Sequence, residues 1–151
     1  MPPPPPYQMQ PVAAATTYGG FWIRFVAIFI DGLIVGVPLG IVLSIISAAT
    51  NSSSSNPSPT FVVFELIAFL IEAAYFVCFW STGSTLGMRI FKLRVVDANT
   101  GQPIGVGRAV LRYVGYIISA VVCYIGLIWA AFDSRKQGWH DKIAGTVVLQ
   151  G

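Results

Sequence analysis

Three long apolar runs divide the chain, at about residues 21–46, 61–80 and 109–132. Each is as long as, or longer than, the ~20 residues that an α-helix needs to cross the hydrocarbon core of a bilayer. Short polar or charged segments separate the runs. The pattern predicts an all-α integral membrane protein with three main apolar helical segments.

The polar segments between the runs indicate which side of the membrane each one faces. Residues 51–60 are uncharged and rich in serine, which is typical of a translocated loop. Residues 81–108 are basic, with Arg89, Lys92, Arg94 and Arg108. Because basic loops stay on the inner side, we expect the N-terminus and residues 81–108 to lie there.

The third run permits two topologies. A basic tail at residues 133–142 follows it. A single span would place this tail outside, against the rule that basic segments stay on the inner side of the membrane. A re-entrant hairpin would keep it inside. The small residues Gly115, Ser119 and Cys123 share a helix face, which favours an unbroken helix, whereas the charges favour a return. We expect the tail inside, where Gly145–Leu149 can pair with Leu93–Val96 of the strand-like Leu93–Asp97 as a short cytoplasmic β element.

Composition narrows the class of protein further. Of the 151 residues, 55% are hydrophobic and 10% charged, against about 25% charged in soluble domains. The net charge of +3 comes mostly from residues outside the apolar runs, which suits anionic lipid better than nucleic acid. The single histidine excludes a histidine metal cluster, and no nucleophile–base set is present, so we expect neither an enzyme nor a cofactor. Residues 1–17 are proline-rich and predict a disordered tail before a domain at 18–150.

Ionisable residues inside the first two runs are the main candidates for function. Asp31 lies ~15 Å from the inner end of its helix and Glu72 ~16 Å from the outer end of the next, so both fall near the midplane. We expect a proton or small cation to bind at Asp31 and Glu72, with Glu65 nearer the outer surface. The alternative is that each carboxyl is protonated and hydrogen-bonded to a neighbour such as Ser44 or Tyr75. A direct Arg24–Asp31 bridge is not expected, because the two are separated by ~10 Å of helix rise.

A face of small residues follows the first run, at Gly32, Gly36 and Gly40. Such a face lets another helix approach closely in a membrane. Because three spans enclose little space, we expect a homo-oligomer that meets through this face.

Three sequence pieces together resemble the RDD family, small bacterial membrane proteins named for one arginine and two aspartates. These pieces are Gly20-Phe21-Trp22-Ile23-Arg24-Phe25 leading to Asp31-Gly32, then Thr85-Leu86-Gly87-Met88-Arg89 with Leu93-Arg94-Val95-Val96-Asp97, and finally Gln137-Gly138-Trp139-His140-Asp141-Lys142-Ile143-Ala144-Gly145-Thr146-Val147-Val148. By this resemblance, Arg24, Asp31 and Asp141 are the name-giving residues. Met88 departs from the family, whose members tend to carry lysine there.

The resemblance implies a multi-pass protein of the bacterial cytoplasmic membrane, and transport of unidentified ligands has been suggested for the family. It also implies that Asp141 on the inner side lies level with Arg24, so that the two form a structural latch. Our preferred hypothesis is a transporter or ion-coupled carrier subunit. The alternative is a non-transporting scaffold or assembly factor that acts through helix packing and the proline-rich tail.

Overall fold

The computed structural model of the protein describes residues 17–53, 55–122 and 125–151. The predicted disordered tail therefore lies outside the described residues except for Thr17, which is the first residue of strand β1 (Thr17–Tyr18).

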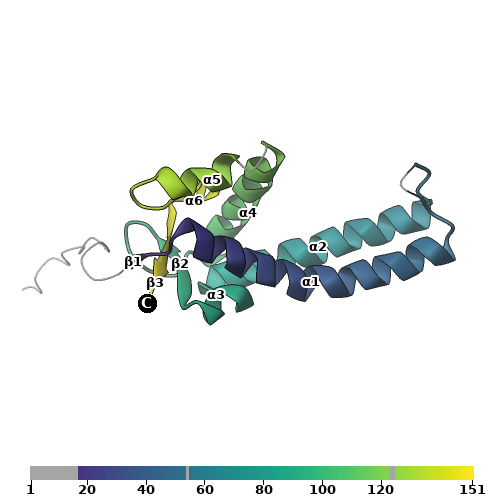
Figure 1. The fold of residues 1–151 in the computed structure, drawn as a ribbon, viewed down its shortest axis with the longest axis horizontal. Helices are drawn as coiled ribbons and strands as arrows, with labels where there is room; N and C mark the ends of the chain where they lie inside the picture. The colour runs from purple at the N-terminus through teal and green to yellow at the C-terminus, as the bar shows by residue number, and fades with distance from the viewer. Residues whose placement is uncertain (1–16, 54, 123–124) are drawn as a thin grey trace, which may run out of the picture.

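A long helical hairpin dominates the molecule (Figure 1). Helix α1 (Phe21–Ala49) and helix α2 (Pro59–Thr82) run side by side and are joined at their far end by the serine-rich loop. The Ser58 side chain accepts a hydrogen bond from Phe61 N at 3.1 Å, which caps α2 at its start. Both helices are long and apolar enough to cross a membrane. This confirms the first two predicted segments, which the helices extend by a few residues.

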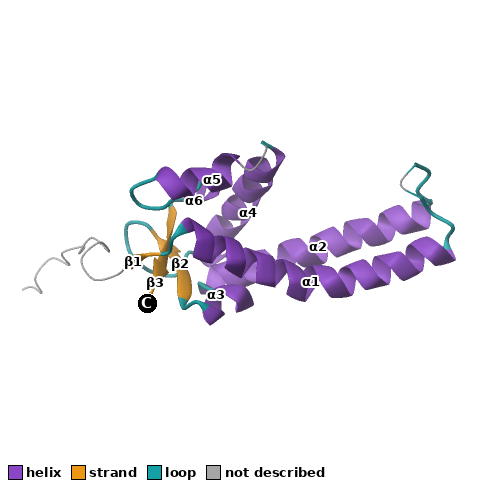
Figure 2. Ribbon diagram, viewed as in Figure 1, coloured by secondary structure: helices purple, strands orange, loops and turns teal. Residues whose placement is uncertain are grey.

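The remaining elements gather at the other end of the hairpin (Figure 2). They are α3 (Leu86–Ile90), β2 (Leu93–Asp97), α4 (Gly105–Val121), α5 (Ile125–Phe132), α6 (Trp139–Ala144) and β3 (Thr146–Gln150). The three strands form one antiparallel sheet in the order β1-β3-β2. We call this sheet, together with α3 and α6, the platform.

The predicted β pairing is confirmed, with Val95 of β2 opposite Val148 of β3. Strand β1 was not predicted, because two residues are too few to show the alternation of polar and apolar positions that indicates a strand. The fold is thus mostly helical but not all-α, since it contains a three-stranded sheet.

The third apolar run is not one straight helix. Helices α4 and α5 meet at an angle of 102°. Helix α6, which follows α5, packs against α4. The basic tail therefore returns to the platform, at the end of the hairpin where α1 begins (Figure 1).

An aromatic core joins the hairpin to the platform. Phe76 and Trp80 of α2 contact Tyr113 of α4 with ring centroids 6.3 and 6.4 Å apart. Met88 and Leu93 are buried beside them. This core fixes the position of α4, which carries part of the site described next.

Candidate functional site

A buried carboxylate holds two arginines from different helices. Asp141 of α6 has no exposed surface. Its Oδ2 accepts a hydrogen bond from Arg24 Nη1 of α1 at 2.9 Å, and its Oδ1 accepts one from Arg112 Nη1 of α4. Gly138 N also donates to Oδ2, at 3.0 Å. Burial alone would raise the pKa of Asp141, but the guanidiniums of Arg112 and Arg24 hold it well below its usual range.

The same arginines also bind the strand that follows Asp141. Arg24 donates from Nε to Gly19 O at 2.8 Å and from Nη2 to Val148 O at 3.3 Å. Arg112 donates to Thr146 Oγ1 at 2.7 Å, and its guanidinium lies 4.9 Å from the ring centroid of Trp80. The cluster of Arg24, Arg112 and Asp141 therefore fastens α1 and α4 to the platform. We call it the arginine–aspartate cluster.

His140 adjoins this cluster as a neutral side chain. It is 5% exposed, and its Nε2 lies 3.6 Å from Asp141 Oδ2. Burial lowers the pKa of His140 from 6.5 to about 4, with the charges of Arg112 and Arg24 acting in the same direction and Asp141 against it. Its Nδ1 is buried and forms no hydrogen bond with the described residues. The imidazole is therefore uncharged at neutral pH.

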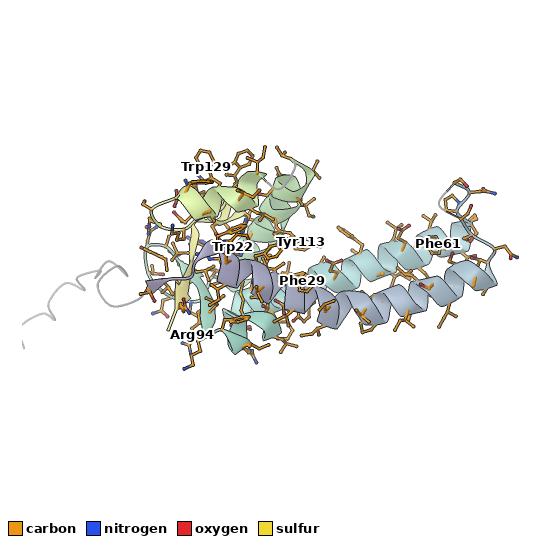
Figure 3. The ribbon with its side chains drawn as sticks, viewed as in Figure 1. Trp22, Phe29, Phe61, Arg94, Tyr113 and Trp129 are labelled. Carbon is orange, nitrogen blue, oxygen red and sulfur yellow. The ribbon has the colours of Figure 1, made fainter. Side chains whose placement is uncertain are left out.

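A cavity of about 650 Å³ lies beside the cluster, between α1, α4 and α5. Arg24, Arg112 and His140 contribute to its lining, and most of the remaining wall is apolar. Trp22 and Phe29 of α1 also line it (Figure 3).

Asp31 is also completely buried, but it belongs to a different set of contacts. It accepts hydrogen bonds from Tyr75 Oη at 2.8 Å, Thr85 Oγ1 at 2.5 Å and Gly87 N at 2.8 Å. Tyr75 is thus a neighbour of the kind that the alternative interpretation expected, whereas Ser44 donates to Gly40 O instead. Asp31 holds the start of α3 against α1, and Glu72 is not among its hydrogen-bond partners.

Glu65 and Glu72 are exposed on α2 and form no hydrogen bond or ion pair with any described residue. Phe69 and Phe76 lie about one helical turn before and after Glu72, and both contact Tyr113 of α4. Glu72 therefore lies near the side of α2 that faces α4.

Gly32, Gly36 and Gly40 also remain open. A Cβ added at any of them would meet nothing within 4 Å. Within the described ranges, no three His, Cys, Asp or Glu side chains are grouped so that they could hold a metal ion.

The structure brings together Arg24 and Asp141 and keeps Asp31, Glu72 and Glu65 apart from them. Sequence reasoning missed Arg112 as a member of the cluster. The only available signal was an arginine near the start of an apolar run, a position where the long side chain ordinarily reaches the membrane surface.

These features define a small, mostly helical protein in which an arginine–aspartate cluster fastens a platform to two helices of membrane-spanning length. The chain belongs to the RDD family, whose model matches residues 18–145.

Relatives in several bacteria resemble most of the chain. It is 38% identical to the uncharacterized protein YxaI of Bacillus subtilis, over 86% of this chain and 95% of that protein. It is 29% identical to the uncharacterized membrane protein YteJ of the same organism, over 87% of this chain and 80% of YteJ. It is 31% identical to the proline-rich antigen of Mycobacterium leprae, over 85% of this chain but only 60% of that longer protein. No solved structure matches the chain.

Proposed function

We propose that the chain is a carrier subunit of the bacterial cytoplasmic membrane, in which Glu72 takes up and releases a proton or small cation. The observation that carries this proposal is the position of Glu72, which lies near the middle of a helix long enough to span a membrane, is exposed, and forms no hydrogen bond or ion pair with any described residue. Glu65 shares the exposure but lies nearer the outer end of the helix. An ionisable side chain within such a span is costly unless it faces water, another helix or a bound ion.

Glu72 suits this role better than Asp31. Three donors already occupy the Asp31 carboxyl group, from Tyr75, Thr85 and Gly87. Removing them to admit a cation would release α3 from α1. In the proposed carrier, Asp31 therefore positions the hairpin, and exchange takes place at Glu72.

A homo-oligomer supplies the second wall of the proposed ion path. The hairpin helices are largely exposed in the single chain, and the open face at Gly32, Gly36 and Gly40 accepts a close helix. In the proposed oligomer, a neighbouring copy also covers the exposed side of α2 and shields Glu72 from lipid.

The test is flux in vesicles that contain the purified full chain. We expect a pH-sensitive dye inside the vesicles to report cation-driven proton movement for the wild type. Glu72→Gln should reduce the rate at least about tenfold, the change that 1.4 kcal/mol of lost binding would produce. Glu65→Gln is the matched control, since Glu65 lies two turns nearer the outer end of α2, and it should keep most of the flux. Equal rates for wild type and Glu72→Gln would contradict the proposal.

The scaffold remains a second candidate, because the open glycine face suits a different membrane protein as well as a second copy. Under this alternative, Gly36→Leu abolishes recovery of a co-purifying membrane protein, while Glu72→Gln has no effect on it. Absence of flux in wild-type vesicles, together with that loss, would favour the scaffold.

A further inference from the structure

We propose that the cavity between α1, α4 and α5 binds one anionic phospholipid, with its phosphate group beside Arg112 and part of an acyl chain along α1. This site is separate from Glu72 and does not depend on carrier activity.

The charges around the cavity do not balance. Arg24 and Arg112, 6% and 1% exposed, share the single carboxylate of Asp141, while His140 is neutral. The other carboxylate whose charge acts on Arg24, that of Asp133, is already paired with Lys142 at 2.7 Å. The cluster therefore carries one excess positive charge in a buried setting, where an unmatched charge is costly. An anion bound in the cavity would supply the missing charge.

Two buried polar atoms without hydrogen-bond partners among the described residues belong to residues that line the cavity. These atoms are Arg112 Nε and His140 Nδ1. Arg112 Nε always carries a proton, whereas Asp141 Oδ2, 3.6 Å from His140 Nε2, favours the tautomer with the proton on Nε2 and leaves His140 Nδ1 as an acceptor. Phosphate oxygens, like carboxylate oxygens, accept strong charge-assisted hydrogen bonds from an arginine.

The walls of the cavity indicate that this anion also has an apolar part. Its lining includes Phe21, Phe25 and Phe29 of α1 and Leu127 and Ile128 of α5. At about 650 Å³, the cavity is far larger than a free phosphate ion needs. A free ion would leave these apolar walls uncovered, whereas an acyl chain would cover them.

The position of the cavity also fits a lipid. It lies along the first turns of a membrane-capable helix, where Trp22 is 74% exposed (Figure 3). Tryptophan is favoured at the level of lipid headgroups. A phospholipid there would place its phosphate near the start of α1 and its chains beside the rest of the helix.

Native mass spectrometry of the full chain, released from nanodiscs, tests the proposal. The nanodiscs hold equal amounts of phosphatidylglycerol and phosphatidylcholine with identical acyl chains. We expect one retained lipid per chain and about a tenfold preference for phosphatidylglycerol, as for one charge-assisted hydrogen bond. Ala131→Phe, which fills the cavity wall, should abolish retention. Ala74→Phe adds the same bulk at an exposed position of α2 outside the cavity lining and should leave retention unchanged.

A second pair of variants tests the charge separately from the shape. Ala130 lines the cavity and is 4% exposed. Ala130→Asp adds a carboxylate that neutralises the excess charge, so the preference for phosphatidylglycerol should disappear. Ala130→Asn has nearly the same size without the charge and should keep it. Circular dichroism identifies any variant that fails to fold. If a variant at position 130 does not fold, the comparison of Ala131→Phe with Ala74→Phe tests whether the lipid binds in the cavity.

Several results would overturn the proposal. Equal retention of the two lipids by the wild type would remove the role of the charges. Displacement of the lipid by millimolar inorganic phosphate would assign the site to a free anion. A dimer that Ala131→Phe dissociates, with no lipid retained by the wild type, would assign the cavity to a second copy of the chain. Glu72→Gln should retain lipid normally, so failure of the carrier and failure of this lipid site are distinguishable.

Discussion

At the scale of single residues, Asp141 and Asp133 are carboxylates of the same polar segment with very different surroundings. The Asp133 side chain is 14% exposed and pairs with a Lys142 side chain that is 45% exposed. Asp141 is completely buried between two guanidiniums. Ion pairs at the surface contribute little to stability, because water and salt screen them. A buried pair leaves an uncompensated charge when one member is removed.

We therefore expect Asp141→Asn to lower the free energy of unfolding by about 3–5 kcal/mol, because both arginines would then face a neutral amide. Denaturant unfolding in detergent, followed by circular dichroism, measures this. Asp133→Asn is the control and should cost about 0–1 kcal/mol. Equal losses in the two variants would show that Asp141 is not the charge that holds the arginines.

His140 makes the stability depend on pH. Its folded pKa of about 4 lies below its ordinary value of 6.5, so the unfolded chain takes up the proton first as the pH falls. Stability is therefore complete above about pH 6.5 and declines toward pH 4, by roughly 3 kcal/mol at most. In His140→Gln this decline should be much smaller. A wild-type protein with the same stability at pH 7 and pH 4.5 would contradict the prediction.

At the scale of elements, the sequence predicted what depends on local pattern. Helices α1 and α2 follow from apolar length alone, since a membrane leaves a chain few other structures. The pairing of β2 with β3 followed from two β-rich segments on one side. The sequence left two topologies for the run that contains α4 and α5, and the Arg24–Asp141 pair that accompanies the bend, 117 positions apart in sequence, was expected only from the resemblance to the family.

The contacts of Asp31 show the same limit. Helix rise gave its depth, but its donors Thr85 and Gly87 lie 54 and 56 positions further along the chain. No spacing rule brings a loop residue to a helix over that separation. The resemblance singled out Asp31 without revealing what binds it.

Gly87 allows α3 to pack closely against α1. A Cβ at this position would lie 2.2 Å from Ala27 O, a backbone atom that cannot move aside easily. We expect Gly87→Ala to separate α3 from α1 and to weaken the hydrogen bond from Gly87 N to Asp31. Hydrogen exchange of the amides in Leu86–Ile90 measures this, and exchange there should become at least about tenfold faster.

Gly107→Ala is the matched control for this substitution. A Cβ at Gly107, inside α4, would meet nothing within 4 Å. Because alanine favours a helix over glycine by about 0.5–1 kcal/mol, this variant should be neutral or slightly stabilised. If both variants leave the exchange of α3 unchanged, the close contact with α1 does not hold α3 in place.

At the scale of the whole molecule, the arginine–aspartate cluster decides where the C-terminal segment lies. Arg24 near the start of α1 binds Asp141 and Val148 directly. The platform and the loop of residues 50–58 therefore lie at opposite ends of the hairpin (Figure 1). If α4 and α5 formed one complete span, residues 133–142 would instead lie on the side of that loop.

Single cysteines distinguish these two topologies in the native membrane. In a chain with Cys78 and Cys123 replaced by alanine, we would introduce Ser55→Cys in the hairpin loop, Asn99→Cys in the turn after β2, and Ser134→Cys after α5. All three positions are exposed, so an impermeant maleimide can reach each from its own side. We expect Ser55→Cys to react in spheroplasts, which expose the outer side of the cytoplasmic membrane. Asn99→Cys and Ser134→Cys should react only in inverted membrane vesicles. Asn99→Cys marks the inner side of the membrane independently of α4 and α5. If Ser134→Cys reacts from the same side as Ser55→Cys, then α4 and α5 cross the membrane as one span. In that case the Arg24–Asp141 pair does not form in the membrane.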